Sequence, residues 1–178
     1  MKISSVIGKN IKLRDVCEDD AEFILSLRLD KSLGQFISQT DCNLNMQIEW
    51  IKQYKQRINE YYFIIDSKDS IPCGTARIYD IRENSFSFGS WIIKRDAPAF
   101  VAIESFLLVH EIGFCKLGLK NAHLETKREN TKVVNFFKRF GAMQVNEDEG
   151  KNYFNLTYDQ YKKSREKYRR FASEKLKY

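Results

Sequence analysis

The 178-residue chain has little of what marks a disordered, exported or membrane-spanning protein. It contains only two prolines and eight glycines and has no low-complexity tract, which leaves little material for a flexible linker. Its N-terminus, MKISSVIGKNIKL, lacks the sustained apolar run of a secretory signal. The most apolar stretch, residues 97–109, is too short to span a bilayer. We therefore expect one domain over residues 1–178, in the cytoplasm and without a membrane partner.

The four cysteines, Cys17, Cys42, Cys73 and Cys115, are far apart in the sequence. There is no Cys-x-x-Cys pair and no Cys/His cluster, so neither the spacing of a zinc site nor that of a disulfide framework is present. In the cytoplasm such thiols stay reduced. We expect four free cysteines and no bound metal.

Positive charge is concentrated at one end of the chain. The net charge is +6, and residues 158–178 hold eight Lys/Arg against three Asp/Glu. This pattern predicts a basic C-terminal helix, which either presents a solvated face or attracts an anionic partner. No strand interleaves aromatic and basic residues as base stacking requires, so nucleic acid is not the expected partner.

The hydrophobic pattern changes period along the chain, from alternation in strands to a 3.6-residue repeat in helices. It predicts strands at 11–16, 61–65, 75–81, 86–93, 122–126, 143–145 and 153–157, and helices at 21–29, 44–59, 97–117, 130–140 and 158–176. An antiparallel meander followed by helix-linked strands implies a mixed sheet. The expected fold is α/β (α+β), with about six to seven strands flanked by helices.

Several strings resemble the GNAT superfamily of N-acetyltransferases. IKLRDVCEDDAEFILSLR is similar to the family's first strand and helix, GTARIYDI and FSFGSWII to its third and fourth strands, and LETKREN with VVNFFKRFGA to its fifth strand and the next helix. The match resembles the branch of ribosomal-protein N-terminal acetylases and nucleotide-amino-sugar N-acetyltransferases. It implies the GNAT fold over about residues 10–157, acetyl-CoA as co-substrate, a small-molecule amine as acceptor, and a monomer or homodimer.

The resemblance also implies where acetyl-CoA binds. The family's phosphate motif, Gln/Arg-x-x-Gly-x-Gly/Ala, corresponds here to RDAPAF at residues 95–100, where only Arg95 matches. A helix N-terminus at this point would still offer unpaired N–H groups, although Pro98 also fits plain helix initiation. The implied co-substrate contacts are Trp91, Ile92, Ile93, Arg95, Ala97, Pro98, Ala99, Phe100, Val101, Asn130 and Phe137.

Catalysis needs a base for the amine, a donor for the oxyanion and a proton for the thiolate. Glu125 in LETKREN stands where related enzymes carry their base, and His123 shares its strand face, although both could instead be solvated surface residues. Gly89 indicates either a strand bulge that would expose backbone N–H groups or a close packing contact. Phe137 occupies the position of the family's proton-donating Tyr and could be a core residue, while Asn130 could simply cap its helix.

The acceptor is expected to contact residues 30–42, with Gln35, Phe36 and Gln39 as candidates. The favoured function is acetyl transfer to a nucleotide-linked amino sugar. The alternatives are a protein N-terminal acetyltransferase and a non-catalytic CoA or nucleic-acid binding module. We expect the basic C-terminal helix to be dispensable for acetyl-CoA binding.

Overall fold

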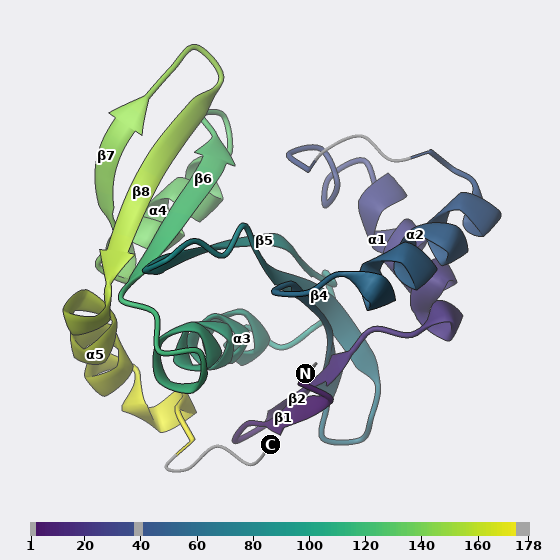
Figure 1. Cartoon of the computed structure of the whole chain (residues 1–178), viewed down its shortest axis with the longest axis horizontal. Coiled ribbons are helices and arrows are strands. Elements are labelled where there is room, and N and C mark those ends of the chain that lie inside the picture. Colours follow the sequence, from purple (N-terminus) through teal and green to yellow (C-terminus); the bar gives the residue numbers. More distant parts are fainter. Residues whose placement is uncertain (1–2, 38–40, 174–178) are drawn as a thin grey trace.

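The computed structural model describes residues 3–37 and 41–173. Within them, eight strands form one sheet in the order β1-β2-β3-β4-β5-β6-β8-β7 (Figure 1). Only β5 and β6 run parallel, and every other neighbouring pair is antiparallel, so the predicted mixed sheet is confirmed. The strands are β1 (Ser5–Ile7), β2 (Ile11–Asp15), β3 (Tyr61–Ser67), β4 (Pro72–Tyr79), β5 (Ser85–Ile93), β6 (Asn121–Lys127), β7 (Met143–Glu147) and β8 (Lys151–Thr157).

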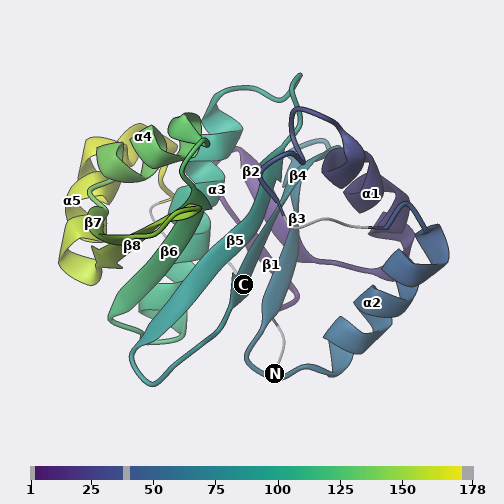
Figure 2. The ribbon, with the colours of Figure 1, turned by 90° about the horizontal axis from the view of Figure 1, so that it is seen from above.

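The α-helices lie on both faces of the sheet. They are α1 (Ala21–Leu29), α2 (Leu44–Gln56), α3 (Phe100–Glu111), α4 (Thr131–Arg139) and α5 (Tyr158–Lys167). Figure 2 shows α1 and α2 on one side of the strands and α3, α4 and α5 on the other. Two separate buried clusters follow from this arrangement, because each face of the sheet is covered by its own helices.

The larger cluster is rich in aromatic residues. Phe86 and Phe154 from the strands, Phe106 from α3, Phe140 beside α4 and Tyr161 from α5 are each at most 2% exposed. The smaller cluster joins α1 and α2 to β3 through Ile24, Ile51, Tyr54, Tyr62 and Ile64. The alternation along β3 decides which side chains reach which cluster, since neighbouring residues of a strand point to opposite faces.

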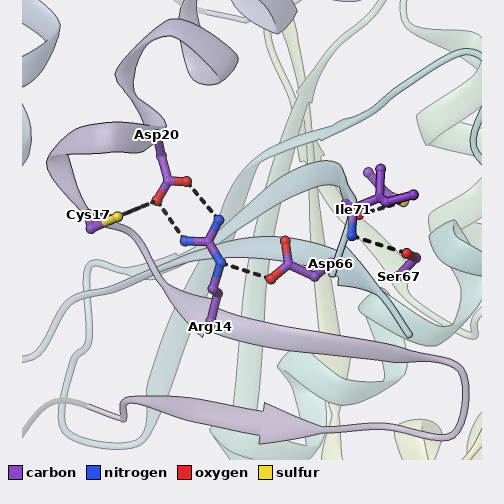
Figure 3. Close-up of polar contacts among 7 residues, drawn as sticks. Arg14, Cys17, Asp20, Asp66, Ser67 and Ile71 are labelled. Atoms are coloured by element: carbon purple, nitrogen blue, oxygen red, sulfur yellow. Dashed lines mark hydrogen bonds and ion pairs between the residues drawn. The ribbon is translucent and has the colours of Figure 1, made fainter. Parts of the chain in front are cut away.

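An ion-pair cluster fixes the start of α1 against the sheet. The guanidinium of Arg14 on β2 makes two bonds to Asp20, at 2.7 and 2.8 Å, and its Nε donates to Asp66 of β3 at 2.8 Å (Figure 3). Asp20 and Asp66 are buried, so removal of the arginine would leave two carboxylates without their cation. The cluster holds α1, and therefore the segment that follows it, in a defined position over β2 and β3.

Capping residues mark several helix ends. Asn43 caps α2 by accepting from the Met46 N–H at 3.2 Å. Gly118 and Gly141, which follow helical segments, have φ values of +71° and +83°. The predicted helix 97–117 is wrong at its start, since α3 begins at Phe100, and a π-helical turn over Ile112–Lys116 follows it. Residue 97 precedes Pro98, whose ring disfavours the α conformation for the residue before it.

Two further expectations need correction. The sheet has one strand more than the six to seven predicted, because β1 pairs with β2 across a turn at Gly8. The basic helix is shorter than predicted, ending at Lys167 before a 3-10 turn at Arg169–Phe171. It is also no detachable appendage, because Tyr161 is 1% exposed and donates to the Leu107 carbonyl at 3.1 Å. Truncation after Thr157 would remove part of the core, so we no longer expect this helix to be dispensable.

Candidate functional site

The central feature of the site is a separation of two parallel strands. β5 and β6 pair only at their first residues, Ser85–Ser87 with Asn121–His123. Beyond that point β5 continues to Ile93 along β4, while β6 continues to Lys127 along β8 (Figure 1). Two strand edges therefore face each other across a widening gap, and the backbone groups along them can bind an extended ligand.

A bulge in β5 lies beside this gap, as Gly89 predicts. Arg77 pairs with Gly89 and Thr75 with Ile92, so β5 has one residue more than β4 over this stretch. The positive φ, +46°, falls on Ser90. The Thr75 hydroxyl donates to the Ser90 carbonyl at 2.7 Å. In a trans peptide the C=O and the N–H point in opposite directions. Since the Ser90 carbonyl points toward Thr75, the Trp91 N–H of the same peptide points away from Thr75, toward the edge of β5 that faces β6.

The side chains that follow the bulge are mostly held by the protein. The Trp91 indole donates to the Ser105 hydroxyl at 3.1 Å and packs on Phe136 of α4, with ring centroids 4.9 Å apart. Ile92 is 4% exposed, and Ile93 packs against the core. Residues 91–93 would therefore meet a ligand through their backbone. Phe136, only partly buried and next to Phe137 in the sequence, was not among the predicted contacts.

The turn before α3 carries Arg95, the one residue that matches the phosphate motif. Its guanidinium is bound to the Asp30 carboxylate at the end of α1, at 2.8 and 3.2 Å. This contact and hydrogen bonds from Ser32 and Leu33 hold the pKa of Asp30 well below its usual range. Arg95 is 63% exposed in its side chain and therefore open to a phosphate, but Asp30 already competes for it.

The other predicted positions at this helix start divide into two groups. The Val101 N–H donates to the Pro98 carbonyl at 2.9 Å, and the Val101 side chain is buried in the core. Ala97 donates to the Lys94 carbonyl at 3.2 Å. The N–H groups of Ala99 and Phe100 precede the first intrahelical bond, and neither donates to a backbone carbonyl outside the helix within the described residues. These two amides therefore stay candidates for binding an anion.

At the start of α4 the structure favours the structural alternatives. Asn130 accepts from the Val133 N–H at 3.3 Å and so caps the helix. Phe137 is 2% exposed and packs between Phe106 and Phe154, at ring-centroid distances of 6.1 and 5.6 Å. Little of the Phe137 ring is left for a co-substrate to touch, and contact with either residue stays a prediction.

His123 and Glu125 lie on the side of β6 away from the aromatic cluster, and each has its own partners. His123 Nδ1 is 3.0 Å from the Ser85 hydroxyl, and its Nε2 is 3.0 Å from the Asp80 carboxylate. Both ring nitrogens are therefore engaged. Glu125 binds the Lys151 ammonium through Oε1 at 2.8 Å, and its side chain is 41% exposed. Its Oε2 has no protein partner within the described part of the chain, which leaves one acceptor for a substrate proton.

Tyr79 is on the same face and was missed in the sequence. It ends β4, pairs with Ser87, and lies against Gly89, so that a Cβ added to Gly89 would be only 2.9 Å from Cε1 and 3.0 Å from the hydroxyl oxygen. The glycine thus makes room for the tyrosine beside the bulge. No local signal could have revealed this contact, because it depends on the pairing of two strands.

The segment after α1 crosses the mouth of the gap. Asp30 ties it to Arg95 on the β5 side, and the Gln35 carbonyl accepts from Lys127 at the end of β6 at 3.3 Å. The Gln35 side chain turns back to the Ser32 carbonyl, and Phe36 is partly exposed. Gln39 lies outside the described residues. The predicted acceptor segment is therefore brought to the two strand ends.

Comparison with known proteins agrees with this geometry. Residues 10–143 match the family model described as an acetyltransferase (GNAT) domain. The chain belongs to the GNAT acetyltransferase family. It is thus an N-acetyltransferase of a family that uses acetyl-CoA as co-substrate. No match was found among curated proteins.

Solved structures extend the comparison over nearly the whole chain. One, described as ligand-free FdhC, a nucleotide-linked sugar GNAT, is 39% identical, with a TM-score of 0.87 over 97% of this chain and 100% of its own. A GCN5-related N-acetyltransferase from Brucella melitensis is 14% identical, with a TM-score of 0.80 over 96% and 86%. Spermidine N-acetyltransferase from Vibrio cholerae, solved with CoA and spermine, is 16% identical, with a TM-score of 0.74 over 85% and 98%. The last two share the fold alone.

Two negative findings concern the described residues alone. None of their helices is long and apolar enough to cross a bilayer. Nor do three or more of their His, Cys, Asp and Glu side chains gather where they could hold a metal ion.

Proposed function

We propose that this enzyme transfers the acetyl group of acetyl-CoA to the amine of a nucleotide-linked amino sugar. Support for the chemistry comes from the bulge, because the Trp91 N–H beside the strand gap would stabilise an oxyanion on the thioester carbonyl. Arg95 and the amides of Ala99 and Phe100 would bind the CoA pyrophosphate. Trp91, Ile92 and Ile93 would contact the pantetheine arm through their backbone.

Glu125 is the proposed base. Its free Oε2 can accept a proton from the amine directly or through one water, while Lys151 holds Oε1. His123 is less suited to this task, because a proton taken at either ring nitrogen would have to displace Ser85 or Asp80. We assign His123 a positioning role at the point where β5 and β6 separate.

The charges around the gap favour an anionic acceptor. Lys127 ends β6 and donates to the Gln35 carbonyl, and no carboxylate pairs with it within the described residues. A cation at this position attracts a nucleotide diphosphate and opposes a polyamine. Support for the sugar comes from the 39% identical structure, whose description names a nucleotide-linked sugar GNAT. Gln35 and Phe36 would contact this acceptor from the segment after α1.

An acceptor screen tests the proposal. We expect CoA release with nucleotide-linked amino sugars, at a kcat/KM well above that for the same sugars without the nucleotide. Spermidine and a peptide with a free N-terminus serve as comparison amines. Preference for the peptide would support the protein N-terminal acetyltransferase instead, and preference for spermidine would contradict the charge argument.

A further inference from the structure

The proposed mechanism lacks a proton donor for the departing thiolate, because Phe137 has no hydroxyl and is buried. Of the hydroxyls near the bulge, Thr75 gives its proton to the Ser90 carbonyl at 2.7 Å. Ser105 gives its proton to the Ala102 carbonyl at 3.2 Å and accepts from the Trp91 indole. The hydroxyls of Tyr79, Ser87 and Ser90 donate to no protein group within residues 3–37 and 41–173, and of the three the phenol of Tyr79 is the strongest acid.

Tyr79 is also held in place by its surroundings. Its ring lies against Gly89, the residue before the bulge, and the Arg77 guanidinium is 5.0 Å from its centroid. Arg77 is fixed in turn by an ion pair with Glu60 and by the Trp50 ring, at 5.2 Å. The phenol is therefore oriented without any group that consumes its proton.

Tyr79 lies in line with both strands of the gap. On β5, its hydroxyl is beside Gly89. Across the sheet, Tyr79 pairs with Ser87 of β5 and Ser87 pairs with His123 of β6, so these three residues share one row on the same face. The Lys151 ammonium, which binds Glu125, also has a charge interaction with Tyr79.

We propose that Tyr79 is a catalytic residue that protonates the CoA thiolate. This inference rests on the acetyl transfer proposed above. The amine nitrogen attacks the thioester carbonyl carbon, and a C–N bond forms while Glu125 takes one proton from the nitrogen. The C–S bond then breaks with its electron pair on sulfur, which receives the proton of the Tyr79 hydroxyl. The proton on Glu125 returns to the Tyr79 oxygen, so that one amide and one free thiol result.

The test is Tyr79→Phe, which removes one oxygen and keeps the ring against Gly89. Its control is Tyr153→Phe, on the same sheet face, whose hydroxyl instead donates to Asp148 at 2.6 Å. The acceptor is whichever amine the wild type acetylates, so the result does not depend on that amine being an amino sugar. Thermal melting and acetyl-CoA binding are measured on all three proteins.

We expect Tyr79→Phe to lower kcat about 100-fold, the usual scale of general acid catalysis, with the KM of both substrates little changed. The solvent deuterium isotope effect on kcat should also fall, because the proton transfer to sulfur is lost. Tyr153→Phe should keep both values. An unchanged kcat in Tyr79→Phe, or a loss that appears as a raised KM for the amine alone, would overturn the proposal.

Discussion

The two faces of β5 and β6 differ in how far they bury ionisable side chains. On the face covered by α3, which we call the core face, Glu104 is fully buried and accepts from Asn10 and from the Ile11 N–H. On the other, open face, Glu125 is exposed, and one of its oxygens has no protein partner within the described residues. Glu104 comes from α3 and Glu125 from β6, and of the two only Glu125 is exposed to solvent.

The histidines differ in burial in the same way, but not in their partners. His110 is fully buried among aromatic rings, with its Nδ1 bonded to the Phe106 carbonyl at 2.8 Å and with no partner for its Nε2 among the described residues. His123 lies at the surface with partners on both nitrogens. Burial therefore separates the two faces more clearly than pairing does, because ionisable groups on the open face are accessible whether or not they have partners.

The largest expected effect is that of Glu125→Gln on catalysis. It keeps the shape of the side chain but removes its basicity, so kcat should fall about 10² to 10³-fold. The loss should shrink as pH rises, since more of the amine is then free without assistance. Melting temperature and acetyl-CoA affinity should stay near wild type. Glu129→Gln, the same change at another exposed position, is the control, and an equal loss there would refute a specific role for Glu125.

On the core face, burial of His110 should instead make the free energy of unfolding depend on pH. Burial lowers the pKa of His110 from 6.5 to about 3. Between about pH 6.5 and pH 3, His110 is therefore protonated in the unfolded chain and neutral in the folded protein. The stability that comes from keeping His110 neutral is complete above about pH 6.5 and is lost as the pH falls toward 3. The free energy of unfolding should drop by about 1.4 kcal/mol per pH unit from this group alone.

Urea unfolding at several pH values measures this slope. Carboxylates add slopes of their own, so the comparison is with His110→Leu, which cannot titrate. The wild type should lose about 2 kcal/mol more than the variant between pH 7 and pH 5. Parallel curves for the two proteins would mean that His110 takes up a proton as readily in the folded protein as in the unfolded chain.

The sequence pattern predicts the fold well because most elements are long and strongly periodic. It misses β1, since three residues before a turn carry too little pattern to distinguish a strand from a loop. It also starts the third predicted helix at residue 97, three residues before α3 begins at Phe100. The apolar pattern carries no information about Pro98, which disfavours the helical conformation of the residue before it.

The site was predictable only where local strings carry it. Gly89 indicates the bulge, and LETKREN indicates Glu125. The contacts of Tyr79 with Gly89 and of Arg95 with Asp30 join residues from separate elements, so no single string contains them. The sequence also does not predict which face of α4 is buried, since two adjacent phenylalanines fit the helical pattern equally well. Packing decides that Phe137 is buried and that Phe136 contacts Trp91.

A smaller effect on kcat is expected from a substitution at the bulge in β5. Thr75→Val keeps the shape of a buried side chain but removes the hydroxyl that holds the Ser90 carbonyl. The peptide that aims the Trp91 N–H would then be free to tilt, and kcat should fall about tenfold, less than for loss of a whole oxyanion donor. Thr75→Ser restores the hydroxyl and should recover the rate. A stable Thr75→Val variant with normal kcat would remove this peptide from the mechanism.

The smallest effect should come from Asp30→Asn, and it should be a gain. The amide oxygen can still accept from the Ser32 and Leu33 N–H groups, so the turn after α1 is retained, but the charge that competes for Arg95 is gone. Exposed ion pairs are weak, so acetyl-CoA should bind only about two- to fivefold more tightly by calorimetry, and less so as salt rises. Asp96→Asn removes a neighbouring charge that pairs with Lys94 instead, at 3.4 Å. An equal gain in that control would show a general field effect, whereas weaker binding in Asp30→Asn would mean that Asp30 orients Arg95 toward the phosphate.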